Sequence, residues 1–156
     1  MVKIKRFGRP TRKLVVELLM DIRKPDFKEL CMVADEPYTA VWQSIMVSQY
    51  CYAVRDKEDN LLAIFGLAKG QVDVNGMKAT PIWFLGTNLA YRHNRAMVHY
   101  GKQFIAEWTH KVGALCNFIW IGNEPSLRYI RHMGARLMEA APMGKNGEFF
   151  IPFILE

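Results

Sequence analysis

The spacing of apolar and polar residues changes several times along the chain, and each change predicts a new element of secondary structure. The opening segment VKIKRF alternates apolar with basic residues, which is typical of a strand with one exposed face. From Thr11 onward, leucine and valine recur at helical spacing, which predicts a helix that Pro25 is expected to end. A second helix is expected within the segment PYTAVWQSIMVSQY.

Three apolar segments in the middle of the chain are typical of strands. YCYAVRD and LLAIFGLAKGQV are separated by a polar turn, so these two segments are predicted to form a hairpin. The segment KATPIWFLGTNLA follows a second turn at Asn75 and Gly76, and its bulky side chains predict a third strand.

The segment from Arg92 to Val112 predicts a long helix with two distinct faces. Apolar residues recur every three or four positions along one face: Met97, Tyr100, Phe104, Trp108 and Val112. Basic residues at similar steps lie on the opposite side and are named here the basic surface: Arg92, Arg95, His99 and Lys102. Gly113 is expected to end this helix.

The last part of the chain predicts a strand, a helix and two further strands. The run CNFIWIG is short and fully apolar, which suits a buried strand. Asn123 can cap the helix that follows, Pro125 fits its first turn, and Gly134 is expected to stop it. Two strands are then expected before the C-terminus, in ARLMEAAP and EFFIPFILE.

The resulting order, β-α-α-β-β-β-α-β-α-β-β, indicates a mixed α/β fold in a single domain over residues 1–156. A chain of this length can bury a core of its own without metal ions or disulfide bonds. No apolar run approaches the roughly 20 residues that a membrane-spanning helix needs, so a soluble protein is expected. The three cysteines form no paired motif and the four histidines have no ligand spacing, so neither a disulfide framework nor a metal site is expected.

The charge of the chain is unbalanced, with 21 Lys and Arg residues against 15 Asp and Glu residues, a net charge of +6. The basic surface of the long helix can be extended by basic residues of the next helix: Arg128, Arg131, His132 and Arg136. Three interpretations stay open, namely a solvated helix face, a docking site for an acidic protein, and contact with nucleic acid. No aromatic residues interleave the basic ones, which argues against binding of single strands.

The predicted order of elements resembles the GNAT (Gcn5-related N-acetyltransferase) fold along nearly the whole chain. The segments PIWFLGTNLA, YRHNRAM and NEPSLRYIRHMGARL take the places of that family's strand, phosphate loop and second motif helix. The resemblance implies a site for acetyl-coenzyme A, because a helix N-terminus offers free N–H groups to its diphosphate. If coenzyme A binds, the resemblance assigns its contacts to Leu89, Arg92, Asn94, Arg95 and Asn123.

The second half of the chain is most similar to the GNAT-like internal virion proteins of short-tailed bacteriophages. The residues that carry this resemblance are FIWIGNEPSLRYIRHMGA, with LLAIFGLAKG and PIWFLGTN before them. It implies a phage protein of the virion interior or the host cytoplasm, which acts in the particle or its assembly through contacts with phage virion or host proteins. It also implies that the protein uses no cofactor and catalyses no reaction.

Three departures from the GNAT motifs favour a loss of catalysis. The two glycine positions of the phosphate loop hold Arg95 and Met97, whose side chains obstruct a close approach of the diphosphate to the backbone. The position of the tyrosine that protonates the departing thiolate holds Ile130, and Tyr129 lies about 100° away around the helix. The two strands that would flank the site contain no Asp, Glu or His to act as a base.

Two functions of different kinds are therefore expected. The first is a catalytically degenerate GNAT-fold protein of a phage, with no catalytic residue. The second is an active N-acetyltransferase that uses acetyl-coenzyme A to modify a host protein or a small amine. An enzyme needs an open cleft between the strands of Phe84 and Trp120, whereas in a binding protein that cleft is expected to be filled. The candidates for filling it are Trp83, Trp120, Arg95 and Met97.

Overall fold

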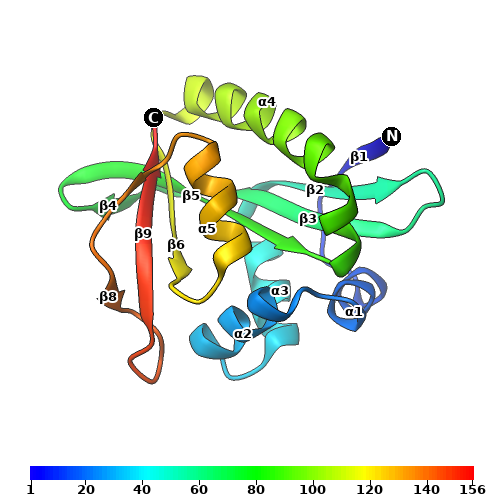
Figure 1. Ribbon diagram of the computed structural model, residues 1–156, viewed down its shortest axis with the longest axis horizontal. Coiled ribbons are helices and arrows are strands. Elements are labelled where there is room, and N and C mark those ends of the chain that lie inside the picture. The colour runs from blue at the N-terminus through cyan, green and yellow to red at the C-terminus, as the bar shows by residue number, and fades with distance from the viewer.

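Nine strands form one mixed β-sheet (Figure 1). The computed structural model describes all 156 residues of the chain. The main strands lie in the order β1 (Val2–Phe7), β2 (Ser48–Asp56), β3 (Leu61–Ala68), β5 (Met77–Gly86), β6 (Leu115–Trp120), β9 (Phe149–Leu155) and β7 (Arg136–Leu137). Two short strands pair at the margins, β4 (Val72–Val74) with β5 and β8 (Ala141–Pro142) with β9.

The sheet is interrupted between β5 and β6, the one pair of neighbouring strands that runs parallel. These strands pair at two positions, Thr80 with Leu115 and Pro81 with Cys116, and then diverge. Beyond this point β5 stays paired with β3, and β6 stays paired with β9. The facing backbone edges of the diverging strands therefore have no strand partner, and their polar groups must find other ones.

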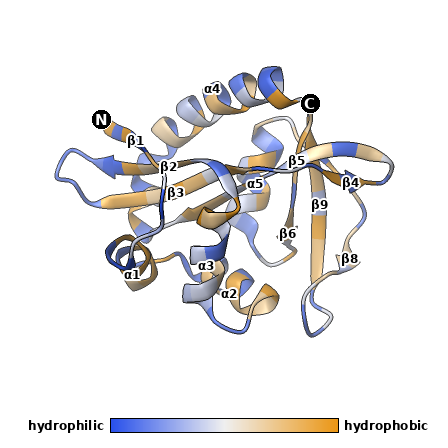
Figure 2. Ribbon diagram, turned by 180° about the vertical axis from the view of Figure 1, so that it is seen from behind, coloured by the Kyte–Doolittle hydropathy of each residue, from blue (hydrophilic) through white to orange (hydrophobic).

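Helices cover both faces of the sheet. α1 (Arg12–Met20), α2 (Lys24–Val33) and α3 (Pro37–Met46) lie on one side, and α4 (Asn94–Val112) and α5 (Glu124–His132) on the other (Figure 1). One buried cluster under α1 and α3 includes Val15, Leu18, Val41, Ile45 and Ile64. Another under α4 and α5 includes Trp108, Leu115, Leu127, Ile130 and Phe153. Figure 2 shows polar and apolar residues alternating along α4, as expected for a helix with one buried face.

The predicted cap of α5 and the predicted stops of the last two helices are confirmed, whereas α4 begins at Asn94 and not at the expected Arg92. Asn123 caps α5, because its side-chain oxygen accepts a hydrogen bond from the Ser126 N–H at 3.3 Å, and Pro125 lies in the first turn. Gly113 and Gly134 follow α4 and α5 with φ values of 84° and 89°. This left-handed conformation is one that glycine adopts without steric cost, so both glycines terminate their helices as expected.

The N-terminal half contains one helix more than the sequence pattern indicates. The first helix ends at Met20, before Pro25 is reached. Pro25, which was expected to end that helix, lies in the first turn of a further helix, α2. Proline fits that place because the N–H groups of a first turn have no intrahelical acceptor. The third predicted strand is also shorter than expected, since β5 ends at Gly86 and a 3-10 helix, η1 (Asn88–His93), follows it.

Several smaller features bear on the expectations from composition. No helix of the chain combines the length and apolar character needed to cross a membrane. Cys51 and Cys116 are buried free thiols, and Cys31 is a half-buried one. No group of three or more His, Cys, Asp or Glu side chains is arranged to hold a metal ion.

Candidate active site

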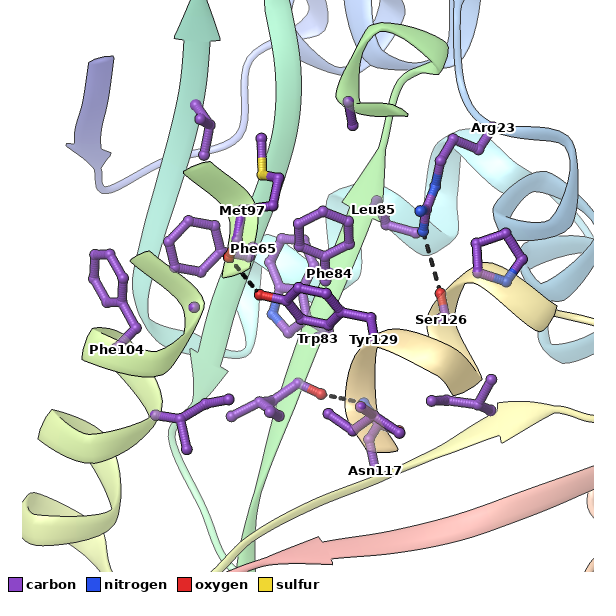
Figure 3. Close-up of a pocket in the computed structure, with 18 of the residues that line it drawn as sticks. Arg23, Phe65, Trp83, Phe84, Leu85, Met97, Phe104, Asn117, Ser126 and Tyr129 are labelled. Carbon is purple, nitrogen blue, oxygen red and sulfur yellow. Dashed lines mark hydrogen bonds between the residues drawn. The ribbon is translucent and has the colours of Figure 1, made fainter. Parts of the chain in front are cut away.

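The divergence of β5 and β6 opens a cavity of about 640 Å³ inside the molecule. Its wall is formed by both diverging strands, by α4 and α5 on one face of the sheet, and by α2 on the other (Figure 3). Most of the side chains in the wall are apolar or aromatic, and Glu29 is the one acidic residue among them. The volume lies in the range of roughly 300–1,000 Å³ that is typical of small-molecule sites.

The edge of β5 that faces the gap presents a backbone N–H and C=O at every second residue. At one end of this edge, Gly86 donates its N–H to Asp26 Oδ2 at 2.9 Å. At the other end, the Ile82 carbonyl accepts a hydrogen bond from the Asn117 side chain, which closes the narrow end of the gap (Figure 3). Phe84 lies between these positions with the same orientation, so its backbone N–H and C=O face the cavity.

Glu29 extends from α2 to the open edge of β6. Its Oε1 accepts two hydrogen bonds at 2.9 Å, from the Trp120 N–H and from the Asn123 side-chain amide. Burial raises the pKa of the Glu29 carboxyl from its ordinary value of 4.5 to about 7, and the Asp26 carboxylate acts in the same direction. The two hydrogen bonds and the charge of Arg23 oppose this increase of the pKa. A carboxyl group with a pKa near neutrality can exchange protons with a bound substrate at physiological pH.

A buried ion pair holds α2 in place beside the cavity. Arg23 donates from Nε to Asp26 Oδ2 and from Nη2 to Asp26 Oδ1, both at 2.9 Å. The same carboxylate accepts a bond from the Asn123 amide at 3.1 Å, and Arg23 also donates to Ser126 Oγ at 3.2 Å (Figure 3). These contacts join α2 to α5 and to the end of β5. Because Glu29 follows Asp26 by about one helical turn, the ion pair also positions the Glu29 carboxyl.

The Tyr129 side chain reaches from α5 to α4 across the cavity (Figure 3). Its hydroxyl donates to the Met97 carbonyl at 2.8 Å, and its ring stacks on Phe84 with the ring centroids 6.1 Å apart. Gly101 makes this approach possible, because a Cβ atom at that position would lie 1.8 Å from the hydroxyl oxygen. Burial raises the pKa of Tyr129 to about 12, so the hydroxyl keeps its proton at neutral pH.

The position of Tyr129 changes what the motif implies. The sequence register places Ile130 at the tyrosine position, and Ile130 does lie in the buried cluster under α4 and α5. Tyr129, one residue earlier, nevertheless extends into the cavity from the same helix. The cavity therefore contains a tyrosine hydroxyl, although it is supplied by a different residue of α5.

The residues expected to contact coenzyme A lie in three different environments. Arg92 and Arg95 are exposed near the start of α4, and Asn94 is exposed beside them and lines the cavity. Leu89 packs against a buried apolar cluster next to β3. Asn123 is fully buried and is not part of the cavity wall, because its side-chain amide donates to the carboxylates of α2.

The basic surface is exposed along the end of η1 and the first half of α4, and it makes no salt bridge within the chain. The basic surface and the cavity share no residues, because none of its four members is part of the cavity wall: Arg92, Arg95, His99 and Lys102. Two basic residues of α5, Arg128 and His132, do line the cavity. The basic character next to the cavity thus comes from α5 as well as from the start of α4.

None of the four residues considered as fillers occupies the cleft. Trp83 belongs to the wall, but it packs against the cluster under α1 and α3, and its Nε1 donates at 2.7 Å to the Oγ of Ser48, the first residue of β2. Met97 is also part of the wall. Trp120 and Arg95 lie outside it, and Arg95 is exposed to solvent. None of these four side chains therefore fills the cavity, and the one side chain shown to cross it is that of Tyr129.

No motif of the sequence singles out Glu29, although its helical spacing carries a signal. Once Pro25 is recognised as the start of a helix, Asp26, Glu29, Leu30 and Val33 fall on one side of it at three- and four-residue spacing. Acidic residues that share a helix face with apolar ones are candidates for burial, and buried acids need partners or a function.

The fold is similar to those of several acetyltransferases of known structure. An aminoglycoside N(6')-acetyltransferase from Legionella pneumophila matches with a TM-score of 0.70 and 11% identity, over 99% of this chain and 91% of that chain. A Bacillus subtilis acetyltransferase in complex with CoA matches over 100% and 99% of the two chains, with a TM-score of 0.60 and 14% identity. Arabidopsis thaliana NAA60 in complex with acetyl-CoA matches over 99% and 98%, with a TM-score of 0.63 and 11% identity.

No protein-family model and no curated protein matches the sequence. At such low identity the structural similarity concerns the fold alone, and nothing in it indicates a relation to phage virion proteins. The expectation of a mixed α/β domain of the GNAT type is confirmed. The chain has the fold of the GNAT acetyltransferases.

Proposed function

We propose that the protein is an N-acyltransferase that transfers the acetyl group of acetyl-coenzyme A to a primary amine. The observation that carries this proposal is the cavity through the interrupted sheet, with the free backbone edge of Phe84 on one strand and the Glu29 carboxyl at the other. A scaffold that works only through its outer surface has no need of such a cavity, because unfilled space in a core reduces stability.

The side of the cavity next to α4 and α5 fits coenzyme A. No side chain caps the N–H groups at the start of α4, and uncapped helix starts attract phosphate. Arg128 lines the cavity, and Arg92 and Arg95 lie near the same helix start, so guanidinium groups can bind phosphate where the glycine loop is missing. The apolar wall and the Phe84 backbone groups suit a flexible chain that carries amides, such as the pantetheine arm.

The residues of this chain provide the groups that acyl transfer to an amine requires. When bound, acetyl-coenzyme A would supply the acetyl group as a thioester. Glu29 would take up the proton that the amine loses on becoming an amide, and its pKa of about 7 suits that role near neutral pH. The Phe84 N–H is free to donate to an oxygen that gains negative charge. Tyr129 keeps its proton and donates it to the Met97 carbonyl, so its hydroxyl holds α5 against α4 in the cavity wall.

Titration calorimetry with acetyl-coenzyme A, followed by an assay for released thiol, tests this proposal. We expect wild-type protein to bind the cofactor at micromolar concentration and Arg92→Ala to bind it more weakly. The Glu29→Gln variant is expected to bind it as wild type does and to lose transfer by roughly 10²- to 10⁴-fold, the usual contribution of a general base. Glu124→Gln, which changes an exposed carboxyl outside the cavity wall, is the matched control.

Two results would contradict the proposal: no heat of binding at millimolar cofactor, or full transfer activity in Glu29→Gln. The narrower hypothesis from the sequence would then take precedence, namely a phage virion or morphogenesis protein that acts through contacts with virion or host proteins. The exposed basic surface of α4 is the face such a partner would meet. Binding of nucleic acid with a steep salt dependence would instead favour the interpretation of the basic surface as a nucleic-acid contact.

A further inference from the structure

The wall of the cavity includes side chains from both faces of the sheet. Phe84 packs with Met97 on the face of α4 and α5, whereas the preceding residue of β5, Trp83, packs on the face of α1 and α3. Both side chains line the same cavity. The part of the cavity on the second face is named here the α2 chamber, and the lining residues assigned to it are Glu29, Leu30, Val33, Trp83, Phe118 and Phe150.

The alternation of side chains in β6 and β9 assigns the two phenylalanines to this chamber. Ile119 and Phe153 belong to the buried cluster under α4 and α5, so Phe118 and Phe150, at odd spacings from them, face the opposite way. The rings of Phe118 and Phe150 are in edge contact, with centroids 5.4 Å apart. The α2 chamber therefore has aromatic side chains of β6 and β9 on the face of α2, and Trp83 of β5, on the same face of the sheet, also lines the cavity.

The charges of the cavity suit an acceptor with a single positive charge. Glu29 is the one carboxyl group in the wall, and the other ionisable side chains there include the cationic Arg23 and Arg128. On α2 itself, Lys28 lies over the Trp120 ring at 5.7 Å. Just beyond the helix, Lys145 donates to the Ala34 carbonyl at 3.0 Å and pairs with the exposed Asp35 carboxylate at 3.5 Å. One ammonium group can pair with Glu29, but a second one buried beside it would have no counter-charge, which is unfavourable.

The α2 chamber opens to solvent past apolar side chains. Val33 is 47% exposed and Phe118 is 37% exposed, although both line the cavity. Large apolar residues exposed at the rim of a pocket are typical of a binding site for an apolar group. The rim and the interior of the chamber thus both favour an apolar group on the acceptor.

We infer that the α2 chamber receives an acceptor with one primary amine carried on an apolar or aromatic group, and that it discriminates against polyamines and aminoglycosides. This inference rests on the proposed acyl transfer. Two sources offer the same chemistry: a free arylalkylamine, and the N-terminus of a peptide that begins with a large apolar residue. Transfer forms the amide bond at the amine nitrogen, breaks the thioester bond, and releases free coenzyme A thiol.

The first test compares acceptors in the thiol-release assay: phenylethylamine, a tetrapeptide that begins with Phe, spermidine and kanamycin. We expect kcat/KM for the better of the two apolar acceptors to exceed that for spermidine and kanamycin by roughly tenfold or more, because a buried cation without a partner is costly. A ratio below one would overturn the inference. Whichever of phenylethylamine and the peptide is preferred identifies the source of the amine.

Direct binding provides a readout that does not depend on turnover. With desulfo-coenzyme A present, phenylethylamine or the peptide is expected to shift the indole N–H resonance of Trp83, whose ring lines the chamber. Spermidine at the same concentration is expected to leave this resonance unchanged. A shift caused by spermidine and not by the apolar amines would contradict the inference.

A second carboxyl group at the rim should alter the preference. Val33→Asp is expected to lower kcat/KM for the apolar acceptor and to raise it for spermidine, each by roughly fivefold or more, because an opposite charge nearby favours the second ammonium group. Val47→Asp is the matched control, since Val47 is 54% exposed and is not part of the cavity wall. Equal effects of the two substitutions would overturn the assignment of the chamber.

The two proposals can fail separately. Absence of acetyl-coenzyme A binding in calorimetry would refute acyl transfer, and the acceptor inference would fail with it. Binding of the cofactor together with preferred acetylation of spermidine or kanamycin would refute the acceptor inference alone.

Discussion

Burial beside the cavity removes much of the water around the Glu29 carboxyl. The effect of this burial on the free energy of unfolding depends on pH. In the unfolded chain its carboxyl ionises near its ordinary pKa of 4.5, whereas in the folded protein the pKa is about 7. Between these values the folded protein holds a proton that the unfolded chain has lost. The contribution of Glu29 to the free energy of unfolding is therefore complete below pH 4.5 and is lost as pH rises to about 7.

The Glu29→Gln variant should reveal this titration. Gln keeps an oxygen that can accept the bonds from Trp120 and Asn123, but it does not ionise. We expect the variant to gain stability relative to wild type between about pH 5 and about pH 8, by roughly 2–3 kcal/mol at most. Arg23 and Asp26 are unchanged in this comparison. Thermal unfolding across this pH range measures the difference, and Glu124→Gln, on the exposed side of α5, should parallel wild type throughout.

A pH-independent difference between Glu29→Gln and wild type would contradict the raised pKa. It would mean that the carboxyl is ionised in the folded protein at all these pH values. Glu29 would then be better described as a structural hydrogen-bond acceptor for Trp120 and Asn123 than as a proton acceptor.

Gly101 and Tyr129 form a second residue-scale pair with a testable coupling. In wild-type protein we expect Gly101→Ala to cost roughly 1–3 kcal/mol, because the new Cβ overlaps with the Tyr129 hydroxyl. In a Tyr129→Phe background the hydroxyl is absent, although the ring Cζ would still lie 3.0 Å from the new Cβ. The same substitution should therefore cost clearly less, at most about 1 kcal/mol, because the higher helix propensity of Ala offsets part of the remaining crowding. Urea unfolding of the four proteins of this cycle gives the coupling energy. Equal effects in both backgrounds would refute the contact.

At the scale of elements, α5 is held to α2 by one fully buried residue. Asn123 caps α5 and donates to both Asp26 and Glu29. We expect Asn123→Ala to cost roughly 2–4 kcal/mol, because the cap is lost and two buried carboxylates each lose a donor. Thr11→Ala removes only the cap of α1, an exposed bond to the Leu14 N–H at 3.2 Å, and should cost about 1 kcal/mol.

Urea denaturation of these two variants compares the two caps directly. Similar losses of stability for Asn123→Ala and Thr11→Ala would mean that Asn123 contributes as a helix cap alone. A clearly larger loss for Asn123→Ala would assign the excess to its bonds with α2, and hence to the contacts that position Glu29.

At the scale of the whole molecule, two parts of the sheet meet at only two residue pairs. β1, β2, β3 and β5 form one part, and β6, β9 and β7 form the other. Hydrogen exchange should report this division. We expect slow exchange in β3, which is paired on both edges, and slower exchange at Leu85, whose N–H faces β3, than at Phe84, whose N–H faces the cavity.

Acetyl-coenzyme A should slow exchange at Phe84 with little effect on β3, if it occupies the gap as proposed. Amide exchange followed by NMR, with and without the cofactor, measures both effects. Equal exchange rates for Phe84 and Leu85 in the free protein would mean that the edge of β5 is covered. The enzymatic proposal would then lose its central structural support.

The order of elements could be predicted because it depends on local patterns. The three- and four-residue spacing of apolar residues from Met97 to Val112 predicts α4, and Gly113 predicts its end. Asn123 and Gly134 predict the two ends of α5 in the same way. Proline is ambiguous by the same local logic, since it is excluded from a helix interior but accepted in a first turn. For this reason the position of Pro25 did not predict α2, the helix that carries Glu29.

The sequence alone therefore determined the fold class and most helix and strand positions, because periodicity and caps act over a few neighbouring residues. The cavity and its chemistry were decided in three dimensions. Glu29 meets Trp120 across 91 positions of sequence, and Tyr129 enters the cavity although Ile130 holds the motif position. Such contacts depend on how β5 and β6 diverge and on how α2 and α5 pack beside the gap. No spacing within either segment encodes these distances, and they form only when the whole sheet is assembled.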